Sequence, residues 1–340
     1  MKLGLHLGYW QKHPTDRFIE LAQQAERLGF DSVYTAEAYG SDCFTPLAAI
    51  ATQTSKIRVC TGVMQLSART PACAATTAIT LDHLSNGRLC LGVGVSGPQV
   101  VEGWYGQQFK RPLERTREWL DIFRQVVARE KPVEFSGKQY NLPYNGPNSL
   151  GLGKPLKSIT HPLRKKIPVF LGAEGPKNIA LAAERFDGWM PIFVSPYRMG
   201  IFDESLANKP DDFEINAMVN VIVNDNLEEA MFPGKMTMAL YLGGMGAKDE
   251  NFHQNLMGRM GFGDEAQKVQ DLWYEGKHEE AIKAVPDALV DEISLVGPKE
   301  RIRERLQDWK KSPVTTIMMG HRDHYETSVD TMEFIASEVL

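Results

Sequence analysis

The sequence predicts an α/β protein built as a TIM (β/α)8 barrel, with one insertion after strand 4 and another after strand 7. Short apolar segments alternate with segments of helical periodicity, and such alternation favours a parallel sheet because parallel neighbours need a crossover that is usually helical. The 340 residues suit one large barrel or two ordinary domains. Eight βα units with two insertions favour the closed barrel, so we expect a single domain over residues 1–340.

The first half of the chain predicts four βα units in succession. Strands are expected at 3–8, 32–36, 57–63 and 89–95, and helices at 15–28, 45–54, 71–84 and 113–129. The first helix has Leu21, Ala22 and Ala25 at helical spacing and is closed by Gly29. The strand at 89–95 is apolar and ends in glycines, which is typical of a parallel strand covered on both faces.

The second half of the chain continues the alternation of strands and helices, and two insertions interrupt it. The first insertion, at about 130–166, is rich in Gly, Pro and Asn and contains a possible hairpin at 132–142. The remaining elements are strands at 168–171, 188–192, 214–224 and 315–319, with helices at 177–185, 298–310 and from 328 onward. A helical, Met-rich insertion spans about 226–286, and its methionines either line an apolar substrate pocket or form a packing layer or dimer surface.

Bulk composition excludes several classes of protein. The formal net charge is -5, from 38 basic and 43 acidic residues, whereas a nucleic-acid binder normally has a basic excess. No stretch approaches the roughly 18 continuous apolar residues of a membrane span, and the first residues lack the pattern of a secretion signal. We expect a cytoplasmic protein that acts on a small organic molecule, without a membrane or nucleic-acid partner.

The residues after each strand are the candidates for chemistry, because barrel active sites are built at the carboxyl ends of the strands. The candidates for proton transfer are His6, Glu37, Tyr39 and Glu102. Each has a structural alternative, since a histidine in an apolar strand is often a core residue and the others can order a loop. Aromatic residues at the same ends are candidates for the wall of an apolar pocket: Tyr9, Trp10, Tyr39 and Trp104.

The segment after the fifth strand predicts an anion site. It comprises Gly172, Ala173, Glu174, Gly175, Pro176 and Lys177. Pro176 suits the first helical turn, and the exposed N–H groups of a helix start attract phosphate, although an ordinary capped turn has the same pattern. We expect no metal site, because the sequence has neither a His-x-x-x-His motif nor a Cys-His ligand pair. We also expect no covalent nucleophile, because a Gly-x-Ser-x-Gly nucleophile elbow does not occur.

The run from 80 to 97 carries a specific resemblance. It reads Thr-Leu-Asp-His-Leu-Ser-Asn-Gly-Arg-Leu-Cys-Leu-Gly-Val-Gly-Val-Ser-Gly. This string resembles the bacterial luciferase-like monooxygenase family. Segments 2–10, 25–34 and 171–178 resemble other parts of the same family's sequence, at the spacing along the chain that the family shows. The continuation to residue 106 is more similar to the branch that uses the deazaflavin coenzyme F420 than to the light-emitting enzymes.

The resemblance implies a cofactor site and a mode of assembly. The cofactor is F420, with FMN as the alternative. Its ring is supported by Gly62, Val63 and Met64, and Ser96 and Gly97 are further cofactor-binding residues. A non-proline cis peptide at Gly62–Val63 forms a bulge behind the ring, the loop 172–177 holds the phosphate chain, and the second insertion covers the substrate. A homodimer packed through the early helices is also implied. The chain departs from several relatives at one position, because Ala38 rather than histidine follows Glu37.

These observations predict an oxidoreductase that transfers a hydride between F420 and an organic substrate. Three alternatives stay open: an FMN-dependent monooxygenase of the same family, a non-catalytic flavin-binding protein, and a sugar-phosphate barrel enzyme without flavin. The last explains the anion loop but not the signature at 80–88.

Overall fold

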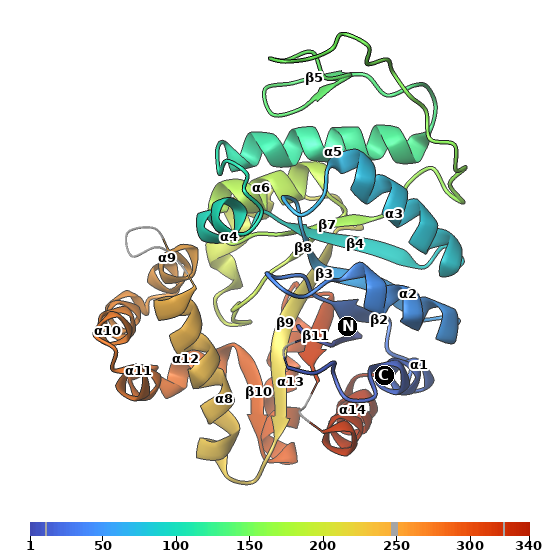
Figure 1. Ribbon diagram of the computed structural model, residues 1–340. Coiled ribbons are helices and arrows are strands. Elements are labelled where there is room, and N and C mark those ends of the chain that lie inside the picture. The colour runs from blue at the N-terminus through green and yellow to red at the C-terminus, as the bar shows by residue number, and fades with distance from the viewer. Residues whose placement is uncertain (11, 246–250, 322–323) are drawn as a thin grey trace. The chain divides into compact units, whose positions relative to one another are not determined.

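The structure is a computed structural model that describes residues 1–10, 12–245, 251–321 and 324–340 (Figure 1). The contacts within the chain divide it into two units. The N-terminal unit comprises His6–Arg27 and Asp31–Gly172, and the C-terminal unit comprises Met1–Leu5, Leu28–Phe30 and Ala173–Leu340.

The N-terminal unit contains a parallel sheet with the strand order β2 (Ser32–Thr35), β3 (Arg58–Gln65), β4 (Leu89–Gly94) and β7 (Val169–Gly172). Its helices are α1 (Phe18–Arg27), α2 (Phe44–Gln53), α3 (Pro71–Leu84), α4 (Pro98–Gly103) and α5 (Pro112–Ala128). All six residues of β4 are buried, which confirms that this strand is covered on both faces. The alternation predicted for this half is therefore confirmed.

The bounds of α3 coincide with the predicted helix at 71–84, and local chemistry explains both ends. Thr70 Oγ1 accepts a hydrogen bond from the Cys73 N–H at the start, where Pro71 occupies the first turn. At the other end, Asn86 and Gly87 adopt φ angles of 53° and 81°, which an L-residue rarely adopts within a helix.

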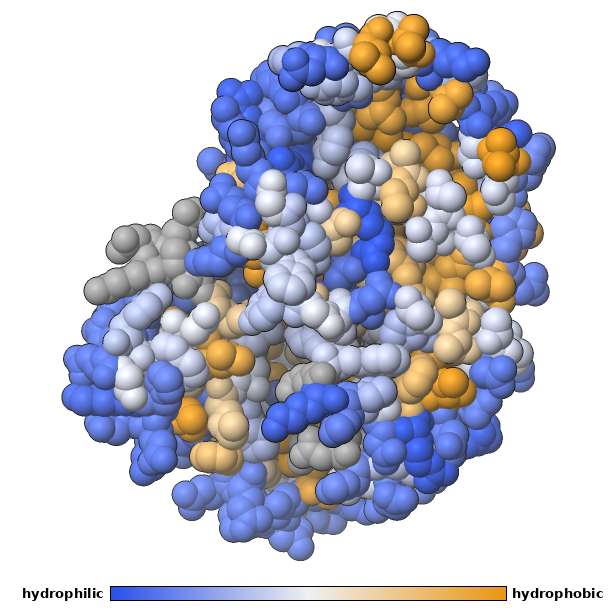
Figure 2. Space-filling model, viewed as in Figure 1, coloured by the Kyte–Doolittle hydropathy of each residue, from blue (hydrophilic) through white to orange (hydrophobic). Residues whose placement is uncertain are grey.

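The insertion at 130–166 contains the expected hairpin, formed by β5 (Phe135–Ser136) and β6 (Asn141–Leu142). The Glu118 carboxylate of α5 accepts hydrogen bonds from three successive backbone N–H groups, those of Lys138, Gln139 and Tyr140. Beyond the hairpin the segment exposes large apolar side chains, among them Leu150 at 86% and Ile159 at 95%. Hydrophobic residues are visible on this part of the surface at the top of Figure 2.

The C-terminal unit is organised around the long strand β9 (Glu214–Val223). Three parallel strands pair with successive parts of it: β8 (Gly188–Met190), β11 (Thr316–Gly320) and β10 (Ser294–Gly297). The strand β1 (Lys2–His6) begins in this unit, where the Lys2 N–H donates to the Thr315 carbonyl. The strand β10 was not predicted, because its four residues are too few to show a period between two helices.

The helices of the C-terminal unit are mostly short. They are α6 (Pro176–Arg185), η1 (Met199–Phe202), α7 (Asp203–Leu206), α8 (Leu227–Ala239), η2 (Leu240–Gly244), α9 (Phe252–Arg259), α10 (Gly263–Tyr274), α11 (His278–Ala284), α12 (Asp287–Glu292), α13 (Lys299–Lys311) and α14 (Tyr325–Val339). The insertion at 226–286 is helical as predicted, apart from residues 246–250, which lie outside the described part of the chain.

The methionines of this insertion divide into two groups. Met238, Met257 and Met260 are buried, as expected of a packing layer, whereas Met236 and Met245 are exposed. Among the helices that the structure describes, none has the length and apolar character needed to cross a membrane.

Two charged residues of the signature at 80–88 hold the N-terminal unit together. The Arg88 guanidinium donates to four backbone carbonyls at the ends of neighbouring elements, those of Ala51, Thr54, Ile57 and Ser85. The buried Asp82 carboxylate accepts hydrogen bonds from the Leu89 N–H and from Arg164. The signature is therefore a structural junction that joins α2, α3 and the strand β4.

We predict that Arg88→Met lowers the free energy of unfolding by about 2–4 kcal/mol, because several part-buried carbonyls lose a charged donor. Urea denaturation followed by circular dichroism measures this change. Arg27→Met is the control, since the exposed Arg27 guanidinium donates to the Gln24 side chain on its own helix, and its cost should stay within about 0.5 kcal/mol. Equal stability of the two variants would contradict the structural role of the signature.

Candidate functional site

The carboxyl end of β3 forms a bulge against β4. The pairing register shifts between Thr61 and Met64, and the Gly62–Val63 peptide is cis, as the family resemblance implies. The Val63 carbonyl accepts a hydrogen bond from the Glu37 N–H at 3.1 Å. The bulge therefore belongs to the same hydrogen-bonded structure as the end of β2.

His6 lies beside this bulge with both ring nitrogens bonded to backbone. Its Nδ1 accepts a hydrogen bond from the Gly8 N–H at 3.1 Å, and Nε2 lies 2.8 Å from the Gly62 carbonyl oxygen. This pattern fits the neutral ring with its proton on Nε2, donating to Gly62. The ring is buried and stacks on Tyr34. The catalytic role of His6 stays a prediction, and its contacts support a positioning role for the Gly62 peptide.

Two glycines leave the space that this arrangement needs. A Cβ atom on Gly62 would lie 3.2 Å from the Tyr34 ring and 3.3 Å from the His6 ring. A Cβ atom on Gly94 would lie 2.8 Å from Cγ2 of Val63. Glycine at position 94 therefore lets the Val63 side chain fold down against β4.

Glu37 is a buried carboxylate that is fully engaged. Its Oε2 accepts the Gln65 N–H at 2.9 Å, and its Oε1 pairs with the Arg69 guanidinium, which also binds Asp42. Burial alone would lower the pKa of Arg69, but the hydrogen bond and charge of Glu37 outweigh it and raise that pKa. Glu37 thus has a permanent cationic partner.

The same ion pair affects two neighbours. Burial raises the pKa of the Tyr105 hydroxyl, and the negative charge of Glu37 adds to this shift. Burial opposes ionisation of Asp42, but hydrogen bonds from Thr45 and the charge of Arg69 lower its pKa overall. Glu37, Asp42 and Cys43 also place one ligand atom each within 4.8 Å of the others, and Arg69 already pairs with both carboxylates of this group.

Gln65 presents an unused acceptor at this place. Its side-chain nitrogen donates to the Glu37 carbonyl at 3.3 Å, which orients the amide. Its Oε1 is buried and accepts no hydrogen bond from any residue that the structure describes. A buried acceptor without a protein partner can accept a hydrogen bond from a water molecule or from a ligand.

The remaining predicted residues of the N-terminal unit lie in loops after β2 and β4. The rings of Tyr39 and Trp104 are 6.5 Å apart and are 56% and 61% exposed, so they offer an apolar surface to a ligand. Ser96 has a φ angle of 61°, and Gly97 begins α4. Glu102 is exposed and accepts the Phe109 N–H at 3.1 Å, which orders its own loop.

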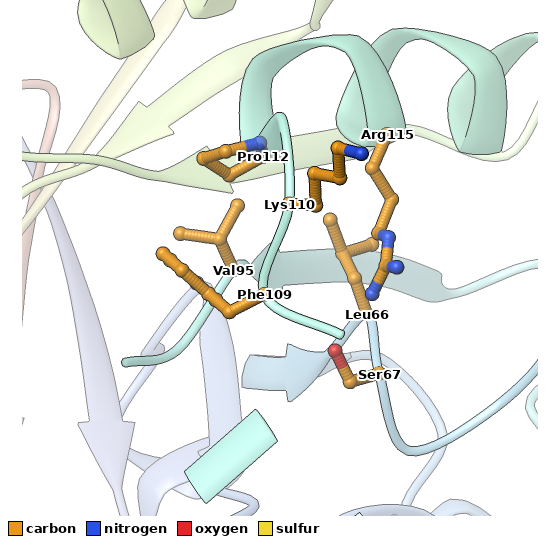
Figure 3. Close-up of a pocket in the computed structure, with 7 residues that line it drawn as sticks. All are labelled: Leu66, Ser67, Val95, Phe109, Lys110, Pro112 and Arg115. Atoms are coloured by element: carbon orange, nitrogen blue, oxygen red, sulfur yellow. The ribbon is translucent and has the colours of Figure 1, made fainter. Parts of the chain in front are cut away.

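A small crevice lies where β3 and β4 end and α5 begins (Figure 3). Its apolar wall comes from Leu66, Val95, Phe109 and Pro112. Ser67, Lys110 and Arg115 complete the lining, so two cations border the crevice. Sequence reasoning missed these residues, because they come from loops without a recognisable motif.

In the C-terminal unit, the predicted anion loop leads into α6. Gly175 is the N-cap residue and Pro176, which has no N–H, is the first helical residue. The Asn178 and Ile179 N–H groups donate to the Gly175 carbonyl, which leaves the Lys177 N–H as the first-turn donor for a ligand. The Ala173 carbonyl accepts a hydrogen bond from the Trp189 side chain at 2.7 Å. Asn178 Oδ1 is buried without a partner among the described residues. Lys177 is exposed.

Two residues of α9 hold this loop from the second insertion. The Arg259 guanidinium donates to the Glu174 carbonyl, and His253 Nδ1 lies 2.7 Å from Glu174 Oε1. Burial lowers the pKa of Arg259, and the Glu174 charge opposes that shift. The sequence did not predict the role of either residue. The insertion has no βα periodicity, so its pattern does not show which of its side chains contact the end of a strand.

Comparison with known proteins identifies the class. The luciferase-like monooxygenase model matches residues 3–316, and the chain belongs to this family. It is 50% identical over 328 residues to "Putative coenzyme F420-dependent oxidoreductase Rv3520c" of Mycobacterium tuberculosis, covering 94% of both chains.

Solved structures show the same fold. The coenzyme F420-dependent tetrahydromethanopterin reductase of Methanopyrus kandleri superposes with a TM-score of 0.79 at 20% identity, over 99% of this chain and 98% of that one. An FMN-bound Baeyer–Villiger monooxygenase from Pseudomonas putida gives 0.66 at 22% identity, over 100% and 97%. These similarities confirm the TIM-barrel fold predicted from the sequence.

We predict that Gly94→Ala destabilises the protein by about 1–3 kcal/mol, because the added methyl group overlaps Val63. Thermal unfolding measures the effect, and the double variant Gly94→Ala with Val63→Ala should recover most of the loss. Gly103→Ala is the control, since a Cβ there meets no atom within 4 Å. If Val63→Ala gives no recovery, the contact between these two residues is not what requires glycine.

Proposed function

We propose that the protein is a coenzyme F420-dependent oxidoreductase that transfers a hydride between the deazaflavin and a small organic substrate. One observation carries the proposal: the chain is 50% identical, over 94% of its length, to a protein whose name gives that cofactor.

The N-terminal unit supplies residues that fit the cofactor ring. Gly62, Val63 and Met64 form the bulge that the resemblance places behind the ring, and Gln65 Oε1 is a buried acceptor that suits a ring N–H donor. When bound, the deazaflavin supplies the hydride chemistry, because its reduced ring carries two electrons and a hydrogen on carbon. The protein contributes a fixed backbone surface and a carboxylate, Glu37, whose charge Arg69 balances.

The C-terminal unit supplies residues that fit a phosphate group. Residues 173–177 lead into the N-terminus of α6, where backbone N–H groups favour an anion. Arg259 adds a full positive charge beside the Glu174 carbonyl. In this proposal the backbone of the loop binds the phosphate, and Arg259 binds it through charge-assisted hydrogen bonds.

The loops after β2 and β4 supply an apolar surface for the substrate. Tyr39 and Trp104 expose more than half of their side chains and lie close enough for their rings to contact one ligand. An aromatic pair of this kind favours a flat or apolar organic molecule.

A second candidate is an FMN-dependent monooxygenase, favoured by the family match and by the similarity of fold to an FMN-bound enzyme. Parallel fluorescence titrations with oxidised F420 and with FMN distinguish the two. Our proposal predicts tight binding of F420 and weak binding of FMN. Preference for FMN would contradict the proposal and favour oxygen-dependent chemistry.

We further predict that Arg259→Met weakens F420 binding about 10- to 100-fold, the loss expected for one charged hydrogen bond. The deazaflavin Fo, which lacks the phosphate tail, should bind both proteins equally. Arg303→Met, which removes a surface ion pair with Glu338, serves as the control. Equal weakening of F420 and Fo binding would show that Arg259 acts on the fold and not on the phosphate.

A further inference from the structure

The crevice at the start of α5 is bordered by two cations that have no carboxylate partner (Figure 3). Within the described ranges, neither Lys110 nor Arg115 forms an ion pair. The Arg115 guanidinium makes one long contact, 3.5 Å from its Nη1 to Gln107 Oε1. A guanidinium offers several N–H donors, so most of the hydrogen-bonding capacity of Arg115 is unused.

The acidic side chains of α5 are engaged elsewhere. Glu114 pairs with Arg111 and Lys138, and the Glu118 carboxylate accepts three backbone N–H groups of the hairpin. None of the residues that line the crevice is acidic. Two like charges beside one crevice repel each other, and an anion bound between them replaces this repulsion with attraction.

Ser67 contributes a buried hydroxyl to the same crevice. The residue is 4% exposed, and its hydroxyl forms no hydrogen bond with any residue that the structure describes. Figure 3 shows the Ser67 oxygen on the side of the crevice where the Arg115 guanidinium lies. A buried hydroxyl that faces a crevice is a hydrogen-bond donor available to an anion.

The amide of Gln107 braces these groups. Its nitrogen donates to the Ser67 carbonyl at 2.9 Å, and its oxygen is the atom that Arg115 contacts. The backbone on the other side of Ser67 is also fixed, because the Leu66 N–H donates to the Gly94 carbonyl at 3.0 Å. The polar groups of the crevice are therefore held in place by β3, β4 and the loop before α5.

The size of the crevice restricts what it can bind. Its volume is about 10 Å³, close to the space that one water molecule needs, so it admits a small group and not a whole substrate. A planar carboxylate suits this space better than a tetrahedral phosphate does. Carboxylate oxygens also match the fork of an arginine side chain, with which they form two parallel hydrogen bonds.

We propose that this crevice binds the carboxylate group of the substrate, with Arg115 as its main partner and Lys110 and Ser67 as further donors. This inference rests on the proposed function, and it names the substrate class as an organic acid. The crevice begins one residue after Gln65, the acceptor that we assign to the cofactor ring. The loop that we assign to the phosphate belongs to the C-terminal unit, so the phosphate has a different site.

Benzoate and benzamide are the probes, because they have nearly the same shape and differ in charge. Their affinities are measured by ligand-observed NMR titration at neutral pH, without cofactor and in a buffer free of carboxylates. We expect the wild type to bind benzoate at least about 10-fold more tightly than benzamide. Equal affinity for the two probes would overturn the proposal.

Variants of the crevice locate the binding site. Arg115→Met should weaken benzoate binding by about 10-fold or more and leave benzamide binding unchanged. Arg115→Lys keeps the charge but not the fork, so we expect a smaller loss of about 3-fold. Ser67→Ala should also weaken benzoate binding, by about 3-fold. Unchanged benzoate affinity in Arg115→Met would overturn the proposal.

Two other arginines serve as controls. Arg111 lies in the same loop and pairs with Glu114, so Arg111→Met should not change the affinity for benzoate. Arg259→Met tests the anion loop of the C-terminal unit and should also leave this affinity unchanged. A preference for benzoate that is lost in Arg259→Met and kept in Arg115→Met would place the acid at the other loop and overturn the proposal.

Addition of F420 separates the two sources of an anionic group, the substrate and the cofactor tail. Benzoate should stay bound to the wild type at saturating F420. Displacement of benzoate by F420, but not by Fo, would assign the crevice to the cofactor tail and overturn the proposal. Failure of the wild type to bind F420 would contradict the proposed function alone, since the benzoate titrations need no cofactor.

Discussion

The backbone turn at the end of β3 is the constraint on which the N-terminal site depends. Its two carbonyls are both used: Gly62 accepts from His6, and Val63 accepts from the Glu37 N–H. The Val63 side chain then needs Gly94 beneath it, and the Gln65 N–H needs the Glu37 carboxylate. A change at any of these residues shifts the bulge, so a histidine, a glutamate and two glycines act as one structural group.

Ion pairs constrain buried carboxylates in other parts of the chain. Buried carboxylates are costly unless they are paired, and removal of one partner from a buried pair costs roughly 3–5 kcal/mol. Arg69, Arg164 and Arg198 each form an ion pair with a carboxylate. Glu174 is paired with an imidazole instead.

The sequence predicted much of the fold because its signals are local. Helix α3 has its cap, its proline and its closing Asn-Gly within a few residues of its ends, and β4 is a continuous apolar run. The strand β10 was missed, since four residues between helices show no period. The domain organisation and the homodimer stay predictions.

The candidate site was predicted only in part, because its chemistry depends on distant residues. Glu37 and His6 were chosen from their places at strand ends, but their partners are separated from them in sequence by 32 and 56 residues. These partners turn two candidates for proton transfer into groups that are fully bonded in the folded chain. His253 and Arg259 lie in an insertion that no strand period orders, so only the structure relates them to Glu174.

The most direct test of the account is a crystal structure of the protein with oxidised F420. We predict electron density for the deazaflavin ring against the backbone of Gly62 to Met64, with a ring N–H within hydrogen-bonding distance of Gln65 Oε1. A ring bound elsewhere, with the bulge and Gln65 Oε1 free of ligand, would contradict the assignment of this end of β3 as the cofactor site.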